Sequence, residues 1–294
     1  MSVAFTWKCV LKEGVHARPA GYIERLCNLF SADVQWRNTR THLTANAKSA
    51  LAIIATDTLL GDVCEIVLQG DDEHTASVQL NDLLNQLDAW KEGQEERSAL
   101  AEGYLPRSLL ATQAEFIAGT RVSGRVAIAR PVIFHHLTLG ELPARNPGGA
   151  FSVEGEKARI SKALLRLRRE KEALLNTTRS LEHDILQAHI SLIADPQFLA
   201  TLNGYISDHQ NAWSAVVQAS MASCETLSGS TSRYINERTL DVFDIALQLL
   251  TQLYGADEVS QRPLILNRPS VVFANSLTPS QFLALNKNWL AGIV

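Results

Sequence analysis

The segment Glu13-Gly-Val-His-Ala-Arg-Pro-Ala20 constrains the fold more than any other part of the sequence. It joins an apolar run over residues 3–11 to a stretch in which apolar residues recur at helical spacing. Gly14 allows a sharp turn where the predicted strand ends. Pro19 falls in the first helical turn, where its missing N–H costs nothing. The segment therefore predicts a strand, a tight turn and a helix, with His16 at the N-cap position of that helix.

A histidine at this position has a chemical use as well as a structural one. The unpaired N–H groups and the positive end of a helix favour an anion, above all a phosphate. Arg18 adds a planar donor fork that matches phosphate oxygens. We therefore interpret His16 as a candidate nucleophile for phosphorus, with Ala17 and Arg18 as the phosphate-binding residues. The alternative is that His16 only caps the helix, because polar residues at helix starts are ordinary. In either role we expect its side chain to be exposed.

The segment Gly14-Val-His-Ala-Arg-Pro-Ala20 resembles the active-site signature of HPr, the histidine-containing phosphocarrier of the bacterial phosphoenolpyruvate:sugar phosphotransferase system. The resemblance continues through residues 43–49 and 61–68 and into a helix with an acidic start near residues 71–90, so it covers a first domain of residues 1–91. It implies an α+β fold, an HPr-like open-faced β-sandwich in the order βαββαβα, with His16 as phosphoacceptor. Within this domain, residues 34–36 alternate as an exposed edge strand does.

Ser49 has two possible roles in this first domain. It resembles the serine that a regulatory kinase modifies in the HPr of some bacteria, which makes it a candidate regulatory site. The alternative is structural, because Ser49 is well placed to cap a short helix that contains Leu51 and Ile54.

The remaining chain divides into a linker and two interleaved parts. Residues 92–113 carry a charged run and a Gly/Pro signal and are interpreted as a linker. Residues 114–150 and 256–294 predict a partial α/β subdomain, and residues 151–255 predict a helical subdomain inserted within it. The segment Ile117-Ala-Gly with Ser123-Gly-Arg-Val-Ala-Ile-Ala resembles the opening of enzyme I, although that family prefers Ser-Pro-Gly at the start of the second motif.

Helical periodicity dominates residues 151–255. One apolar stripe from Leu164 to Leu192 predicts the first of four helices. Asp195 and Pro196 predict the N-cap and first-turn proline of the second. The third is predicted over residues 213–227, and the fourth ends at Gly255.

Two motifs in this region, around His189-x5-Asp195 and around Glu237-Arg238, resemble the helical HPr-docking subdomain of enzyme I. His189, Asp195, Glu237 and Arg238 are therefore docking or structural candidates. We expect His189 to be buried and bonded to Asp195 across the Asp-Pro turn, with direct docking as the alternative. Both roles hold if the pair organises the docking face.

The order of the two domains resembles the multiphosphoryl transfer proteins, which fuse HPr to enzyme I. Residues 270–274, 277–280 and 290–294 predict a strand, a helix start and a strand, similar to the enzyme I segment that leads to its phosphohistidine loop. The resemblance implies a phosphoryl carrier, a phosphotransferase that takes phosphate from enzyme I and passes it to EIIA components of sugar transporters, with the first domain docking on the helical one. The alternative is a non-catalytic module that binds phosphotransferase-system partners according to their phosphorylation state.

No cofactor or metal is expected in this chain. Enzyme I relatives use Mg²⁺ and a C-terminal barrel for the phosphoenolpyruvate step, and we expect that step to need a complete enzyme I. His135-His136 does not predict a metal site, since neighbours on a strand point to opposite faces and no third ligand is in view.

Composition excludes several other classes of protein. A net charge of −4 gives no case for nucleic acid, and no apolar run approaches the length that spans a bilayer. The four cysteines are scattered and form no Cys-x-x-Cys pair. Reduced, buried thiols and the lack of a basic leader favour a cytoplasmic location.

Overall fold

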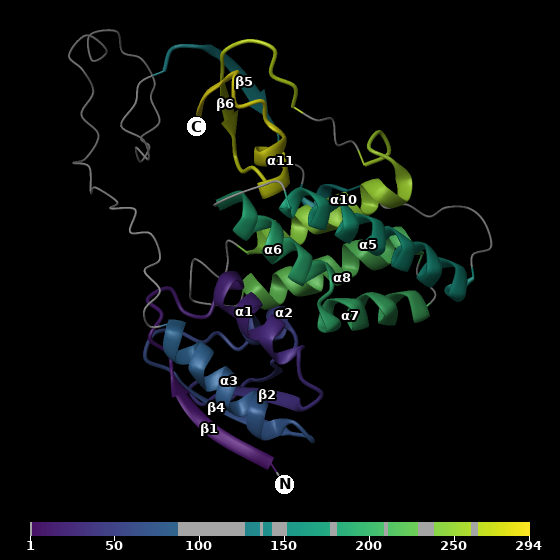
Figure 1. Ribbon diagram of the computed structural model, residues 1–294. Helices are drawn as coiled ribbons and strands as arrows, with labels where there is room; N and C mark the ends of the chain where they lie inside the picture. Colours follow the sequence, from purple (N-terminus) through teal and green to yellow (C-terminus); the bar gives the residue numbers. More distant parts are fainter. Residues whose placement is uncertain are drawn as a thin grey trace.

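The computed structural model describes residues 2–87, 127–135, 138–142, 152–176, 181–208, 211–228, 238–259 and 264–294. A first domain, a helical domain and a small sheet follow one another along the molecule, with the helical domain in the middle (Figure 1). The predicted linker, residues 92–113, and the enzyme I-like segment at residues 117–126 lie outside the described residues.

The first domain has the predicted order βαββαβα. Its elements are β1 (Ser2–Lys8), α1 (Ala17–Cys27), β2 (Asp33–Asn38), β3 (Thr44–Asn46), α2 (Ala50–Ala55), β4 (Val63–Gln69) and α3 (Glu73–Gln86). The strands form an antiparallel sheet in the order β1-β4-β2-β3. Every second side chain of β2 and β4 is buried, whereas the others face outward, so the sheet is covered on one face only.

The prediction of an edge strand at residues 34–36 is wrong. β2 lies inside the sheet, between β4 and β3. Its alternation arises because Val34 and Trp36 face the core while Gln35 faces the open side. Alternation therefore reports a sheet with one solvated face, and it does not report an edge.

The helical domain contains α5 (Val153–Leu175), α6 (Leu181–Ile193), α7 (Pro196–Ser207), α8 (Ala212–Ser228) and α10 (Thr239–Tyr254). The first predicted helix is divided between α5 and α6. α5 ends at the C-cap Asn176, where the helical backbone stops although the apolar spacing continues. The second start is as predicted, because Asp195 caps α7 and Pro196 occupies its first turn. Gly255, with φ 91°, ends α10 as expected.

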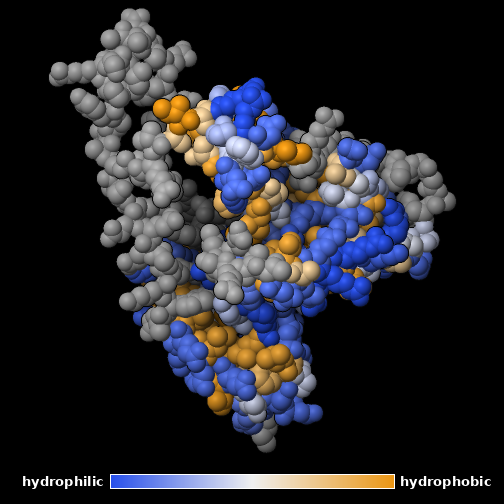
Figure 2. All heavy atoms as spheres, turned by 45° about the horizontal axis from the view of Figure 1, so that its top comes forward, coloured by the Kyte–Doolittle hydropathy of each residue, from blue (hydrophilic) through white to orange (hydrophobic). Residues whose placement is uncertain are grey.

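The small sheet is parallel and has the order β5-β6-β7. Its strands are β5 (Arg130–Phe134), β6 (Ser270–Ala274) and β7 (Leu290–Ile293), accompanied by the 3-10 turn η2 (Leu139–Glu141) and by α11 (Pro279–Ala284). The predicted strand, helix start and strand near the C-terminal end are confirmed. Ile133, Phe273 and Val294 are exposed, and Figure 2 shows hydrophobic surface at the end of the molecule that carries this sheet.

The first domain packs directly against the helical domain. α1 lies against α6, and α2 lies against α6, α7 and α8 (Figure 1). One continuous cluster of buried side chains crosses the contact, with Ile23 and Ile54 on one side and Leu192 and Phe198 on the other. Docking of the first domain on the helical domain is therefore a feature of the structure.

Candidate functional site

His16 occupies the N-cap of α1, as the sequence predicts. Gly14 turns the chain with φ 73°, and the Val15 N–H donates to the Thr58 carbonyl at 2.8 Å. These contacts fix the backbone just before His16, which is extended with φ −92° and ψ −171°. Its Nδ1 accepts from the backbone N–H of Arg18 at 3.5 Å. One ring nitrogen is therefore held over the first turn of the helix.

The surroundings of Nδ1 suit a negatively charged group. The first turn of α1 contains no acidic residue, and Arg18 in this turn carries a half-buried guanidinium side chain. Ala17 places a small side chain at the first helical position, next to His16. A phosphoryl group on Nδ1 would lie at the positive end of the helix, which favours an anion.

His16 is buried, with 6% of its surface exposed, and the expectation of an exposed ring is wrong. That expectation treated the first domain as if it stood alone. The helical domain lies against α1 and α2, so this side of the first domain does not face solvent.

Asp195 lies at the contact between the domains. Its Oδ1 accepts from the backbone N–H groups of Gln197 and Phe198, at 2.9 and 3.1 Å, and so caps α7. Its Oδ2 accepts from the Leu51 N–H at 3.0 Å, and the Ser49 hydroxyl donates to both oxygens at 2.9 and 2.8 Å. Burial raises the pKa of the Asp195 carboxyl, while these hydrogen bonds act in the opposite direction.

Ser49 caps α2 as its structural interpretation predicts, because its Oγ accepts from the Ala52 N–H at 3.0 Å. Its side chain is buried, and its hydroxyl is engaged by Asp195. A kinase therefore has no access to Ser49 while the two domains are in contact. Its regulatory role stays a prediction.

The predicted bond between His189 and Asp195 is wrong. His189 is fully buried, and its Nε2 lies 3.6 Å from Asp244 Oδ2 and 3.9 Å from Asp241 Oδ1, both on α10. α6 ends at Ile193, so Asp195 lies beyond this helix, in the turn where it caps α7. His189 therefore faces α10 while Asp195 faces α2. Burial lowers the pKa of the His189 imidazole, and the two carboxylates oppose this shift.

Asp244 joins the helical domain to the small sheet. It accepts from the Thr278 hydroxyl at 2.9 Å and from the Ser280 N–H at 2.8 Å, at the start of α11. The Ser280 hydroxyl accepts from Lys171 Nζ at 3.1 Å. Arg238 Nη1 pairs with Asp241 at 3.0 Å. Arg238 and His189 thus belong to a polar cluster that joins α6 and α10 to the start of α11. Glu237 lies outside the described residues.

Metal and membrane features can be judged only within the described part of the chain. There, no group of three or more His, Cys, Asp or Glu side chains could hold a metal ion. His136 lies outside it. No described helix is both long and apolar enough to cross a bilayer.

Comparison with known proteins matches both parts of the chain. Residues 3–86 match the family of the PTS HPr component phosphorylation site, and residues 118–238 match the N-terminal region of PEP-utilising enzymes. Multiphosphoryl transfer protein 2 of Escherichia coli (strain K12) is 38% identical over 303 residues, which span 100% of this chain and 35% of that protein. The chain is homologous to the multiphosphoryl transfer proteins.

Other relatives agree with this assignment. Multiphosphoryl transfer protein 1 of the same strain is 30% identical over 288 residues, which cover 97% of this chain and 34% of that protein. The chain thus spans about a third of the length of these multiphosphoryl transfer proteins. The crystal structure of a phosphocarrier protein HPr from Bacillus anthracis str. Ames is 29% identical over 28% of this chain and 95% of its own, with a TM-score of 0.26. The predicted order, an HPr domain followed by an enzyme I N-terminal region, is confirmed.

Sequence reasoning missed one polar residue where the HPr domain meets the helical domain. Glu24 on α1 is buried, and its Oε1 accepts from Asn28 Nδ2 at 2.7 Å. Burial raises the pKa of the Glu24 carboxyl, and a hydrogen bond from Ser191 on α6 opposes this shift. A signal was present, since Glu24 follows the buried Ala20 by one helical turn and so falls on the buried face of α1.

Proposed function

We propose that this chain carries phosphate in the phosphoenolpyruvate:sugar phosphotransferase system, with His16 Nδ1 as the phosphoacceptor atom. In the transfer, the N–P bond of a phosphohistidine on enzyme I breaks, and a new bond forms between phosphorus and the lone pair of Nδ1. In the next transfer the bond between His16 Nδ1 and phosphorus breaks, and phosphorus forms a new bond to the acceptor atom of an EIIA component. Such transfers depend mainly on positioning and on electrostatic stabilisation of the phosphoryl oxygens.

The observation that carries this proposal is the position of Nδ1. It accepts from the Arg18 N–H at 3.5 Å, and the turn that it faces contains no acid. As an acceptor, Nδ1 directs its lone pair to the end of the helix that favours phosphate. Arg18 supplies a charged donor in the same turn, and we assign it to hold the phosphoryl oxygens without taking part in bond formation.

The domain contact supports a second part of the proposal. The helical domain, homologous to the N-terminal region of enzyme I, serves as the docking surface for the HPr domain of the same chain. Delivery to EIIA then requires that the HPr domain leave this surface, because His16 is buried in the docked state. We place these steps in the cytoplasm and assign no metal ion or cofactor to this chain.

Labelled phosphoenolpyruvate with Mg²⁺ and a complete enzyme I provides the test. The chain should acquire one acid-labile phosphohistidine, and His16→Ala should abolish it. Folding should be retained, since loss of an N-cap costs about 1 kcal/mol. The control is His74→Ala, which removes an exposed histidine from α3 and should leave the labelling unchanged. If the wild-type chain took up no label, the result would favour the non-catalytic regulatory module. If His16→Ala still took up label, the phosphoacceptor would be a residue other than His16.

A further inference from the structure

Asp195 accepts hydrogen bonds from both domains, which is more than its role as the N-cap of α7 requires. A carboxylate that only capped α7 would need one oxygen for Gln197 and Phe198. Here the second oxygen faces the HPr domain and accepts from Leu51 N–H and Ser49 Oγ. Asp195 has no exposed surface. All of its hydrogen bonds are therefore made within the protein, and they come from both sides of the domain contact.

The donors on the HPr side depend on this contact. Leu51 is the second residue of α2 (Ala50–Ala55), so its N–H has no partner within its own helix. The Ser49 hydroxyl accepts a hydrogen bond from the Ala52 N–H and donates one to Asp195. When the domains separate, the hydrogen bond between the Leu51 N–H and Asp195 Oδ2 breaks, and both groups form hydrogen bonds with water.

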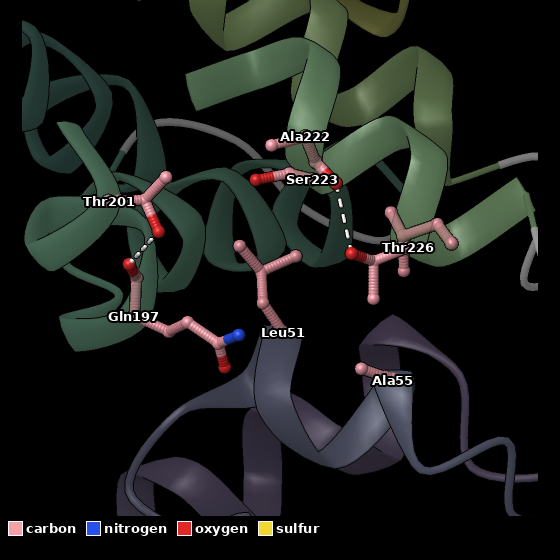
Figure 3. Close-up of a pocket in the computed structure, with 8 residues that line it drawn as sticks. Leu51, Ala55, Gln197, Thr201, Ala222, Ser223 and Thr226 are labelled. Carbon is pink, nitrogen blue, oxygen red and sulfur yellow. Dashed lines mark hydrogen bonds between the residues drawn. The ribbon is translucent and has the colours of Figure 1, made fainter. Parts of the chain in front are cut away.

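Packing next to these bonds does not by itself fix the angle at which α2 meets the helical domain. The Leu51 side chain projects from α2 toward α7 and α8 (Figure 3). It borders a small cavity lined also by Ala55, Gln197 and Thr226. An apolar side chain in a loosely filled space permits several orientations, whereas hydrogen bonds to one carboxylate permit few.

We propose that Asp195 is a positioning residue for docking: its two oxygens join α7 to α2, and this interdomain clamp of Asp195, Ser49 and Leu51 sets how the HPr domain sits on the helical domain. Because the clamp holds the HPr domain on the helical domain of the same chain, it opposes the release of His16 to a separate enzyme I, and it takes no part in the chemistry. This consequence for transfer rests on the proposed function, but the clamp itself does not.

Amide hydrogen exchange of the full chain tests the clamp without any phosphoryl chemistry. Asp195→Asn should speed exchange at the Leu51 amide about tenfold, since one charged hydrogen bond is worth about 1.5 kcal/mol or more. Asn has one oxygen and is as good an N-cap as Asp, so the Phe198 amide of α7 should keep its protection. An unchanged Leu51 amide in this variant would overturn the proposal.

Ser49→Ala gives a second, independent measurement, because it leaves the cap of α7 intact. It too should speed exchange at Leu51, and the effect of the double variant should be smaller than the sum of the two single effects, as expected for partners in one network. The control is Ser152→Ala, which removes the N-cap of α5 away from the contact and should leave Leu51 unaffected. If the increases in Leu51 exchange from the two single variants added fully in the double variant, the clamp would be contradicted.

The same variants then separate docking from chemistry. With enzyme I and labelled phosphoenolpyruvate, Asp195→Asn should raise the rate of label uptake at His16 but leave its final amount unchanged. If the clamp variants alter Leu51 exchange while no chain takes up label, the clamp stands and the proposed function fails. If exchange is unaltered while labelling is normal, the proposed function stands and the clamp fails.

Discussion

Burial governs the chemistry of the cysteine side chains. Cys9, Cys27 and Cys64 are buried and Cys224 is half-buried, and all four are free thiols, as expected from their spacing. Burial raises the pKa of Cys9 and Cys224 to about 11, and that of Cys27 and Cys64 to about 12, from an ordinary value of 9.0. The thiolate, which is the reactive form, is therefore scarce in the folded chain.

Thiol labelling at pH 8 should consequently be slow in the native chain and fast in urea. The raised pKa values also predict a pH dependence of stability. Their contribution is complete below pH 9 and is lost as the pH rises toward 11–12, because the unfolded thiols ionise first. Urea titrations at pH 8 and pH 10 measure this loss. Rapid native labelling of all four thiols would contradict the assigned burial.

Gly14 is the residue whose backbone directs His16. Its φ is 73°, and a Cβ at this position would lie 2.6 Å from the Thr58 carbonyl oxygen. Gly14→Ala should therefore lower the free energy of unfolding by about 3 kcal/mol, through combined strain and clash. Gly61→Ala is the matched control, since its φ is 90° but no atom lies within 4 Å of the added Cβ. It should cost only about 1 kcal/mol, and equal losses in urea unfolding would remove the role of the clash.

At the scale of single elements, the sequence predicted most starts and ends correctly because these depend on neighbouring residues. His16, Ser49 and Asp195 all cap the helices expected of them. The errors concern partners that are distant in sequence. Neither the internal position of β2 nor the placement of His189 beside Asp244 leaves a local signal, since both depend on how elements pack together.

Asp244 provides a test of one element held by another. Asp244→Ala would leave the Thr278 hydroxyl and the Ser280 N–H of α11 without their acceptor. The free energy of unfolding should fall by about 3 kcal/mol, and the Ser280 amide should exchange faster. Asp257→Ala, at an exposed position after α10, should have no such effect. Retained protection at Ser280 would show that α11 is held by other contacts.

At the scale of the whole molecule, the helical domain holds both of its neighbours by buried carboxylates. Asp195 receives donors from the HPr domain, and Asp244 receives donors from α11 beside the small sheet. The two sites lie on different helices, so the helical domain connects parts that do not share a core. The sequence predicted the docking through resemblance and named Asp195 among the docking candidates, but it assigned His189 as the partner of Asp195 and so missed Ser49 and Leu51 across the contact.

Titration of an isolated HPr domain with an isolated helical domain tests this arrangement. Amide shifts in NMR spectra should appear along α1 and α2, which contact the helical domain in the full chain. The solvated face of the β-sheet should stay unchanged, and its residues Gln35 and Glu65 serve as internal controls. Shifts restricted to that face would place the docking surface on the wrong side.

The small parallel sheet has a consequence for the order in which the chain folds. Arg130 of β5 pairs with Ser270 of β6, and α5 to α10 lie between them in the sequence. Bringing these strands together early would close a very long loop, at a large cost in chain entropy. Helix formation shortens that loop before the strands meet, so local contacts form first and the sheet last. Refolding should therefore show helical signal before protection of the β6 amides, and the carrier domain should reach its native state independently of that slow final step.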